Sequence, residues 1–184
     1  MTHSSIAGWI LIPFVFSGLT LLSCRPDGEG PLQKPATAST AAVGELKWQS
    51  FSSGLQSAAA SHRKILIDVY TNWCGWCKRM DKDVYADENI RKYLTDNFEV
   101  VKLNAESDNT HDVNGSTLSE KQIASSWGIT GYPTTVFLDS TGGSITSIPG
   151  YINAQTFRNV LEFIHEDVYK TTSWDDFLRK KGGN

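Results

Sequence analysis

The sequence predicts an α/β fold in which a central mixed β-sheet carries helices on both faces. Residues 65–70 form an apolar, β-branched run, dense enough for a strand buried on both sides, and a helix-forming segment follows it. A second β-branched run opens at Pro133 and turns through residues 140–143 into residues 144–148, the pattern of a β-hairpin. Apolar residues then recur along one stripe of a helix at residues 153–170. Strands and helices of this kind pack as layers around one sheet.

Composition and charge narrow the possible functions. The chain has 184 residues, of which 40% are hydrophobic and 11% aromatic, enough for one packed domain with appended segments. Its net charge of −3 argues against a nucleic-acid partner, because phosphate binding requires a basic surface. We expect a monomer. Three cysteines form an odd set, so one of them should have a role of its own.

Residues 1–23 resemble a bacterial signal peptide. They contain no Asp, Glu, Lys or Arg, and their apolar run at residues 6–22 is short for a membrane span. The run ends in Leu21-Leu22-Ser23-Cys24, which resembles the lipobox of bacterial lipoproteins. That resemblance implies that Cys24 is diacylated and anchors the protein on the periplasmic side of a membrane. The residues before the run lack the usual Lys or Arg. An uncleaved signal anchor is the alternative, and it would also place the rest of the chain outside the cytoplasm.

Residues 24–44 are expected to hold the lipid-anchor site and a flexible linker. Three prolines alternate there with glycines and an Ala/Thr/Ser tract, a composition that cannot bury a core. About 20 such residues reach roughly 25 Å as a flexible coil. The linker would keep a folded domain, residues 45–184, near a membrane surface without fixing its orientation.

The folded domain should begin with a strand at residues 46–51, where apolar and polar residues alternate. A short helix capped by Ser52 or Ser53 follows. Residues 65–70 are expected to be a central strand with a parallel neighbour, because both of its faces are apolar.

The remaining elements continue this pattern. The sequence predicts a helix after Cys74, a helix at residues 87–97, a strand at residues 98–103, a polar loop at residues 106–115 and a helix at residues 119–127. After the hairpin and the amphipathic helix, a tail from residue 171 should add one helical turn. The expected order is β-α-β-α-α-β-α-β-β-α.

Cys74 and Cys77 are the strongest candidates for chemistry. They follow the central strand with two residues between them, so Cys74 should lie where the next helix begins and Cys77 one turn inside it. Helix-end N–H groups would lower the pKa of a thiol at Cys74. Cys77, on the same helix face, could then attack a mixed disulfide formed at Cys74. This spacing predicts a redox-active dithiol. A buried, inert pair would not explain the polar turn and helix start around it.

We expect no metal and no cofactor. A structural zinc site needs four N or S ligands, but the only other cysteine is Cys24, and the four histidines are isolated from one another. Residues 110–115 weakly resemble a calcium loop, in which Lys121 would stand where a bidentate Glu is needed. We interpret residues 106–115 as a solvated loop that could contact a partner.

Three motifs in order resemble the thioredoxin superfamily, over residues 46–166. They are Trp73-Cys74-Gly75-Trp76-Cys77-Lys78, Lys102-Leu103-Asn104 and the segment at residues 127–134. The spacing of Asp68 from Cys74 and the segment at residues 84–89 are most similar to exported thioredoxin-like proteins such as the C-terminal domain of the reductase DsbD. This chain departs from thioredoxin in its Gly75-Trp76 dipeptide and in its longer loop at residues 106–115.

The resemblance implies roles for four side chains. Cys74 would attack a substrate disulfide, and Cys77 would resolve the mixed disulfide. Asp68 would be buried beneath them with a raised pKa, and would exchange a proton with Cys77. Lys102 would pair with Asp68 and tune it. The alternative for Lys102 is an ordinary exposed lysine, and the alternative for Asp68 is a solvated residue at the end of a strand.

The resemblance also implies a substrate-binding segment. Pro133 would follow a cis peptide bond after Tyr132. The backbone of Tyr132, next to Gly131, could then pair with an extended substrate segment as a short added strand. Trp73 and Trp76 would form an apolar rim around Cys74. Their alternative is ordinary core packing, which we consider more applicable to Trp73 than to Trp76.

These features predict a membrane-tethered, extracytoplasmic thiol–disulfide oxidoreductase. The dipeptide Gly75-Trp76 adds no positive charge, so the pKa of Cys74 should be lowered only moderately, as in reductases with potentials of roughly −200 to −270 mV. We expect a reductase of disulfides in exported proteins, recharged by a membrane thiol electron donor. One alternative is a disulfide oxidase or isomerase of exported proteins. Another is a non-catalytic binding module with a structural disulfide.

Overall fold

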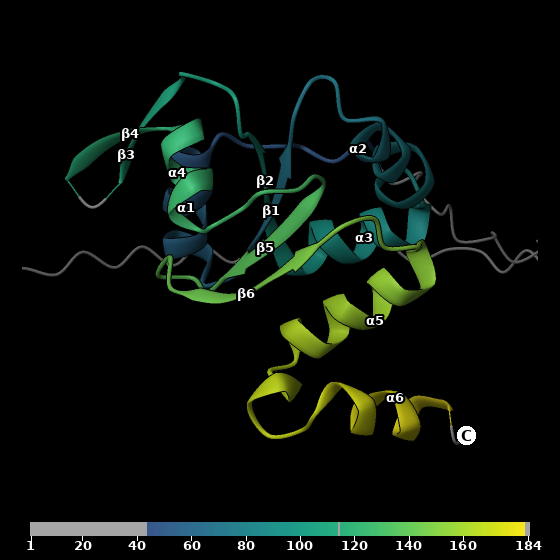
Figure 1. Ribbon diagram of the computed structural model, residues 1–184. Helices are drawn as coiled ribbons and strands as arrows, with labels where there is room; N and C mark the ends of the chain where they lie inside the picture. Colours follow the sequence, from purple (N-terminus) through teal and green to yellow (C-terminus); the bar gives the residue numbers. More distant parts are fainter. Residues whose placement is uncertain (1–43, 114, 183–184) are drawn as a thin grey trace, which may run out of the picture. The chain divides into compact units, whose positions relative to one another are not determined.

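A four-stranded mixed β-sheet forms the centre of the fold (Figure 1). The computed structural model describes residues 44–113 and 115–182. β1 is parallel to β2 and antiparallel to β5, and β5 is antiparallel to β6. The predicted central strand and the predicted hairpin are therefore confirmed. In spatial order the strands are β2 Phe98–Asn104, β1 Lys64–Tyr70, β5 Thr134–Leu138 and β6 Ser144–Pro149.

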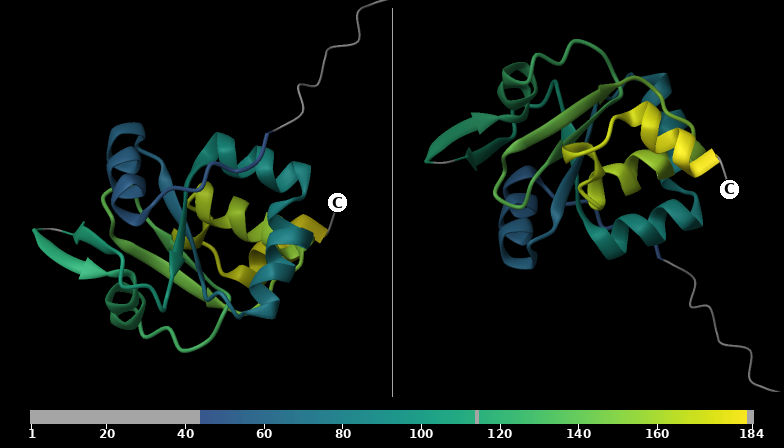
Figure 2. Two further views of the ribbon diagram at one scale, coloured as in Figure 1. Left: turned by 90° about the horizontal axis from the view of Figure 1, so that it is seen from above. Right: turned by 90° about the horizontal axis from the view of Figure 1, so that it is seen from below.

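Helices cover both faces of this sheet, as Figure 2 shows. One face packs against α1 Phe51–Ser61 and α4 Glu120–Ser126. The other face packs against α2 Gly75–Met80, α3 Glu88–Asn97 and α5 Ala154–His165. The predicted α/β class, with a mixed sheet between two layers of helices, is confirmed.

The side chains of β1 alternate between two hydrophobic cores. Ile65, Ile67 and Val69 belong to the core under α1 and α4, whereas Leu66 belongs to the core under α2, α3 and α5. Asp68 is two residues from Leu66, so the period of a strand directs its side chain to the same face as Leu66. β1 therefore carries a carboxylate into the core that α2 covers.

The predicted strand at residues 46–51 is wrong. Only Gln49 pairs with the outer edge of β2, through an isolated bridge. The Gln49 N–H donates to Val100 O (2.9 Å), and the Gln49 carbonyl oxygen accepts from Lys102 N (3.2 Å). The N-cap of α1 is Ser50, not the predicted Ser52 or Ser53. The Ser50 side chain accepts a hydrogen bond from Ser53 N, and α1 begins at Phe51. The cap ends the extended segment before a ladder can form.

The predicted polar loop at residues 106–115 is also wrong in part. It contains β3 Thr110–Val113, which pairs with the following β4 Ser116–Ser119 in a small hairpin beside α4 (Figure 1). Its strands are too polar to be recognised by hydrophobic alternation. They are anchored instead by the buried His111 and by the partly buried Val113 and Leu118, which pack against the core under α1 and α4. The predicted helix after the hairpin is confirmed, with Ser119 and Gln122 forming a capping box.

The C-terminal region differs from its prediction in two ways. α5 ends at His165 instead of residue 170, because Asp167 adopts a left-handed conformation with φ 58° and a short turn, η2 Val168–Lys170, follows. The tail forms a full helix, α6 Trp174–Gly182, rather than one turn. Phe163 of α5 contacts the rings of Trp174 and Phe177 at centroid distances of 5.3 and 5.2 Å. These aromatic contacts hold α6 against α5.

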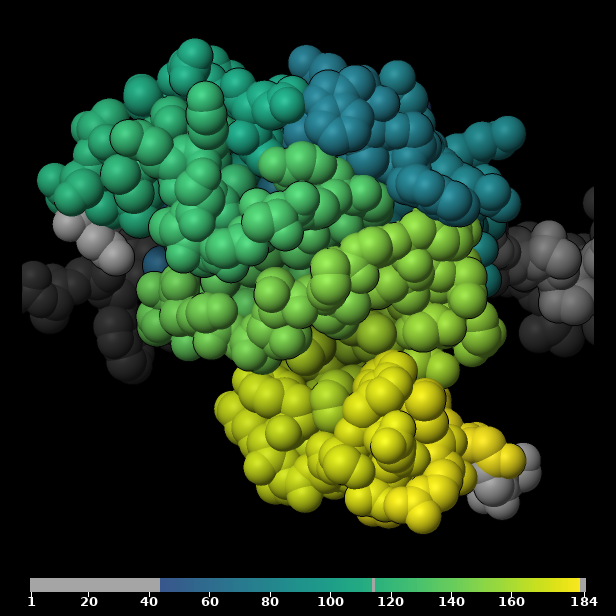
Figure 3. Space-filling view, viewed as in Figure 1, coloured from purple at the N-terminus to yellow at the C-terminus, as the bar shows by residue number. Residues whose placement is uncertain are grey.

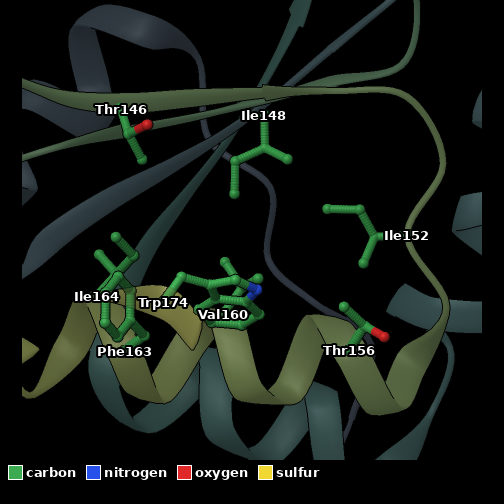
Figure 4. Close-up of a pocket in the computed structure, with 8 residues that line it drawn as sticks. All are labelled: Thr146, Ile148, Ile152, Thr156, Val160, Phe163, Ile164 and Trp174. Atoms are coloured by element: carbon green, nitrogen blue, oxygen red, sulfur yellow. The ribbon is translucent and has the colours of Figure 1, made fainter. Parts of the chain in front are cut away.

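An apolar cavity of about 380 Å³ lies between β6, α5 and the start of α6. Ile148, Ile152, Val160 and Trp174 line it, as Figure 4 shows, and the surface is hollowed between β6 and the C-terminal segment in Figure 3. None of the lining residues is among the predicted site residues. The residues that line the cavity therefore do not include the two cysteines.

The predicted signal peptide at residues 1–23, Cys24 and residues 25–43 of the linker lie outside the described residues. Among the helices that the structure describes, none is at once long enough and apolar enough to cross a bilayer.

Candidate active site

Cys74 and Cys77 form a disulfide at the start of α2. Their sulfur atoms are bonded at 2.05 Å, with 5.3 Å between the Cα atoms. Cys74 is the N-cap of α2, and the backbone N–H of Cys77 donates a hydrogen bond to Cys74 Sγ at 3.0 Å. The expected placement of the two cysteines, one at the helix start and one a turn inside, is confirmed. This geometry directs a helix N–H group at the sulfur that would carry negative charge after reduction.

The two tryptophans of the motif surround a disulfide that is itself almost covered. Each cysteine is 4% exposed, whereas Trp73 is 66% exposed and Trp76 is 55% exposed. Our expectation that core packing applies more to Trp73 than to Trp76 is wrong. Both side chains extend into solvent because the turn before α2 leaves the core at Thr71, which is buried. A substrate that approaches Cys74 therefore meets two indole rings.

Trp73 is held from two sides. Its ring lies 6.0 Å from the ring of Tyr132 in an edge-to-face arrangement. Its Nε1 donates to both carboxylate oxygens of Glu106, at 3.0 Å each. Glu106 follows β2 closely in the chain and precedes the β3–β4 hairpin. The sequence did not predict a role for Glu106.

Trp76 belongs to a second aromatic pair. Its ring centroid lies 5.5 Å from that of Tyr151, just after β6. The guanidinium of Arg79 lies 5.4 Å from the Trp76 ring and 5.7 Å from the Tyr151 ring, within the range of cation–π attraction. Arg79 Nε also pairs with Asp83 at 3.0 Å. The Trp76 side of the rim therefore carries the Arg79–Asp83 ion pair, whereas the Trp73 side carries the carboxylate of Glu106.

The peptide bond between Tyr132 and Pro133 is cis, as expected. Two hydrogen bonds hold this segment: Gly150 N donates to Pro133 O at 2.8 Å, and Thr134 Oγ1 donates to Gly131 O at 2.8 Å. The bond from Gly150 joins the cis-proline segment to the end of β6. This connection brings Tyr132 and Tyr151 to the same end of the sheet as the dithiol.

Asp68 is buried on β1 with 1% exposure, so the alternative of a solvated strand-end residue is wrong. Its Oδ2 lies 3.4 Å from Lys102 Nζ, and its Oδ1 has no hydrogen-bond partner within the described residues. Burial raises the pKa of Asp68 to about 6, although the charge of Lys102 lowers it and that of Asp81 raises it further. A carboxyl with this pKa can accept or donate a proton near neutral pH.

Lys102 serves two carboxylates rather than one. Its Nζ lies 2.5 Å from Asp81 Oδ1, closer than to Asp68. The rings of Trp48 and Tyr70 flank the same ammonium group at 5.1 and 5.2 Å. Lys102 is thus an ion-paired, mostly covered lysine, and the alternative of an ordinary exposed lysine is wrong.

Asp81, like Glu106, is a site residue that the sequence did not predict. It opens η1 Asp81–Tyr85, a π-helical turn that continues α2. Such turns are rare in proteins, and those that occur often lie at functional sites. The sequence shows that Asp81 lies four residues after Cys77, one helical turn further along. That position predicts a contact with Lys102 only when the packing of the helix against β2 is known.

Two buried hydroxyl groups, those of Thr135 and Tyr85, lie near Asp68. Thr135 of β5 is directly opposite Asp68 in the sheet register, and Tyr85 of η1 packs between Trp48 and Phe157. Neither hydroxyl makes a well-aligned hydrogen bond to a described residue. Burial and the charge of Asp68 raise the pKa of Tyr85 well above its usual range. The core around Asp68 is therefore polar enough to hold a carboxyl, and burial there keeps the pKa of that carboxyl raised to about 6.

No group of three or more His, Cys, Asp or Glu side chains in the described part of the chain could hold a metal ion. His111 is the one buried histidine there, and its Nε2 faces Glu120. His3 and Cys24 lie outside the described residues.

Comparisons with known proteins agree with this geometry. Residues 51–165 match the family model of the thioredoxin-like domain. The thiol:disulfide interchange protein DsbD of Yersinia enterocolitica is 28% identical over 153 residues, which cover 78% of this chain and 25% of that protein. DsbD of Ralstonia nicotianae is 29% identical over 104 residues, which cover 56% of this chain and 16% of that protein. The chain thus spans a quarter or less of the length of these relatives.

Solved structures show the same fold. A thioredoxin-fold protein from Helicobacter pylori superposes with a TM-score of 0.57 at 29% identity, over 65% of this chain and 80% of that one. The oxidoreductase DsbH gives a TM-score of 0.57 at 16% identity, over 73% of this chain and 94% of that one, which is a likeness of fold alone. With its family match and its bonded Cys74–Cys77 pair, the chain belongs to the thioredoxin-like family of thiol–disulfide oxidoreductases.

Proposed function

We propose that this protein is a reductase of protein disulfides, in which Cys74 is the nucleophile and Cys77 the resolving cysteine. One arrangement carries the proposal: the Cys74–Cys77 pair stands at a helix start, on the segment that follows a strand bearing a buried carboxyl with a pKa of about 6. The relatives named thiol:disulfide interchange proteins support the same chemistry.

The reaction begins from the reduced dithiol. The thiolate of Cys74 attacks one sulfur of the substrate disulfide, forms a mixed disulfide and releases the other substrate sulfur as a thiolate, which takes up a proton. Asp68 accepts the proton of Cys77, whose thiolate then attacks Cys74 Sγ and displaces the second substrate sulfur as a thiolate, which also takes up a proton. Two electrons pass to the substrate, and the protein is left with the Cys74–Cys77 disulfide of the present structure. A thiol donor must return these electrons.

The direction of electron flow is proposed from the dithiol motif itself. Gly75 and Trp76 add no charge between the cysteines, so the contact that would stabilise a Cys74 thiolate is the helix N–H of Cys77, 3.0 Å from Cys74 Sγ. Oxidases of this fold stabilise that thiolate more strongly. A less stabilised thiolate gives a more reducing couple, in the range of roughly −200 to −270 mV.

Substrate binding is proposed at the cis-proline segment. The backbone at Gly131 and Tyr132 would pair with an extended substrate strand, and the rings of Trp73 and Trp76 would cover the segment that carries the disulfide. The support is their common position around a disulfide that has little other exposure. Gly75, between the cysteines, leaves this approach open because no atom lies within 4 Å of where its Cβ would be.

The location of this activity is the second part of the proposal. Cys24 would be lipidated after removal of residues 1–23, and residues 25–44 would tether the domain outside the cytoplasm. Its substrates would be disulfide-containing exported proteins, and its electron donor a membrane thiol protein. Incorporation of a labelled fatty acid into the wild-type chain, and its loss in Cys24→Ala, would support the tether. Unchanged labelling in the variant would contradict it.

The reductase activity is tested with insulin as the disulfide substrate. Cys74→Ser should reduce the rate to the uncatalysed background, and Cys77→Ser should accumulate a mixed disulfide through Cys74. Wild-type turnover in both variants would contradict the assignment. A measured potential above about −150 mV would favour an oxidase or isomerase. A disulfide that resists mild reductants would favour a non-catalytic module.

A further inference from the structure

A continuous chain of hydrogen bonds joins the rim of the dithiol to the β3–β4 hairpin. At its outer end, Trp73 Nε1 donates to the Glu106 carboxylate at 3.0 Å. Glu106 N in turn donates to Asn104 Oδ1 at 3.1 Å, and Asn104 is the last residue of β2. Trp73 is thereby tied to the edge of the central sheet.

The inner end of the chain is buried. Asn104 N donates to Glu120 Oε2 at 3.2 Å, and Glu120 Oε1 lies 3.2 Å from His111 Nε2. Because a carboxylate can only accept, His111 Nε2 carries a hydrogen, and its Nδ1 lies 3.1 Å from Ser52 Oγ, within hydrogen-bond distance. His111 and Glu120 are each 7% exposed. We call these six residues, from Trp73 to Ser52, the Trp73–His111 chain.

We propose that the β3–β4 hairpin positions Trp73 for binding of protein substrates through the Trp73–His111 chain, so that Glu106 and Glu120 are positioning residues. The inference rests on the proposed reductase function. Glu106 is well suited to this role because Trp73 is two-thirds exposed and, among the described residues, its ring packs against one aromatic ring, that of Tyr132. Without Glu106 the indole would be free to change rotamer.

A fixed indole matters for binding more than for chemistry. Immobilising a free side chain on association costs about 0.5–1.5 kcal/mol, which corresponds to about a twofold to tenfold change in affinity. A protein substrate that packs on Trp73 would benefit from an indole already held in place. A small disulfide that enters between the tryptophans to reach Cys74 would not.

The hairpin contributes the buried part of this support. His111 lies on β3, Ser52 on α1 and Glu120 at the first position of α4, so their contacts join three elements in one buried cluster. Figure 1 shows β3 and β4 beside α4. Buried polar groups held on several sides are rigid because each lost contact leaves an unsatisfied group. The cluster is therefore a firm base for Asn104 and Glu106.

The experiment compares variants of the full-length chain in reduction of insulin and of 2-hydroxyethyl disulfide. Glu106→Ala should raise KM for insulin about twofold to tenfold, with kcat, the redox potential and the rate with 2-hydroxyethyl disulfide unchanged. Glu106→Gln keeps one acceptor for the indole and should remain close to wild type. The indole N–H resonance of Trp73, assigned with Trp73→Phe, should shift in Glu106→Ala.

Variants at the buried end test the chain itself. Glu120→Ala should shift the Trp73 indole resonance and raise KM for insulin in the same direction. Glu120→Gln should do neither, since its amide can accept from Asn104 N and donate to the other tautomer of His111. Thr117→Val removes the exposed Thr117–Asp112 hydrogen bond of the same hairpin and is the matched control, with no expected effect.

Two results would overturn the inference. The first is a wild-type insulin KM together with an unshifted Trp73 resonance in Glu106→Ala. The second is a Thr117→Val variant that changes the insulin KM and the Trp73 resonance as much as Glu120→Ala does. That result would show that any disturbance of the hairpin affects Trp73, without a specific role for Glu120. If the wild-type protein reduces neither substrate, it is the proposed function that fails, and the resonance shifts still test the positioning of Trp73.

Discussion

Lys102 Nζ lies 3.4 Å from Asp68 Oδ2, with the two residues in register across the parallel strands β2 and β1. The ammonium group is closer to a second carboxylate, Asp81, at 2.5 Å. Asp68 therefore receives only part of the stabilisation that a dedicated lysine would provide, and burial keeps its pKa raised to about 6. The balance among these three groups governs how the site responds to pH.

Lys102→Met should move the pH dependence of insulin reduction to higher pH. The charge of Lys102 lowers the pKa of Asp68, so its removal raises that pKa further and leaves less carboxylate to accept the Cys77 proton at pH 6–7. The measurement is kcat from pH 5 to 9. Lys92→Met removes a lysine of an exposed pair on α3 and serves as the control. Identical pH profiles in wild type and Lys102→Met would count against this coupling.

Asp81→Asn should move the same profile in the opposite direction. Asp81 raises the pKa of Asp68 by its charge and also holds Lys102 at short distance, so the neutral amide removes both effects. Asp83→Asn is a matched control on the same turn, because Asp83 pairs with Arg79 instead of Lys102. A shift in Asp83→Asn as large as that in Asp81→Asn would show that the effect is not specific to Lys102.

Asp68→Asn should stabilise the protein at pH 7 while it slows reduction. The folded-state pKa of Asp68, about 6, lies above the ordinary value of 3.8, so the folded state binds a proton more tightly than the unfolded state. That contribution to stability is complete below pH 3.8 and is lost as pH rises to about 6. About two pKa units correspond to about 3 kcal/mol at most. Urea unfolding at pH 7 and at pH 4 measures the change.

The gain from Asp68→Asn should be present at pH 7 and largely absent at pH 4, where wild-type Asp68 is protonated in the folded protein. Equal gains at both pH values would indicate that the substitution acts through packing instead of charge.

Gly54→Ala should destabilise the fold by about 1–3 kcal/mol. A Cβ at Gly54 would lie 2.2 Å from Val101 Cγ2, on the face of α1 that packs against β2. The better helix propensity of alanine, worth about 1 kcal/mol, does not offset such an overlap. Urea unfolding measures the difference. Gly75→Ala, where no atom lies within 4 Å of the new Cβ, is the helical control and should not be destabilised.

Local patterns were sufficient for most of the fold. The apolar run of β1 predicted a central strand because burial on both faces leaves no polar alternation. The hairpin of β5 and β6 and the helix start at Cys74 were predicted for similar reasons, since turn residues and helix caps act within a few residues. The segment at residues 46–51 failed because its extended character is limited to one bridge at Gln49. The β3–β4 hairpin was missed because its strands are polar.

The candidate site divides in the same way. Cys74 and Cys77 are three residues apart, so their geometry follows from a single helical turn. Burial of Asp68 was expected from the resemblance to the thioredoxin superfamily and agrees with its place in an apolar strand. Asp81 and Glu106 were missed because their partners are 21 and 33 residues away in the chain. No local sequence pattern predicts contacts between residues so far apart in the chain.

The amino-acid sequence by itself determined most of the strands and helices of the central sheet and its two layers, the position of the dithiol and the presence of a carboxyl in the core, because these depend on interactions within a few residues and on burial. Only the tertiary structure decided that Lys102 is shared between Asp68 and Asp81 and that Glu106 holds Trp73. Those contacts exist because the sheet and the helices bring distant segments within hydrogen-bond reach, and the energy of a hydrogen bond or ion pair depends on that separation and on burial.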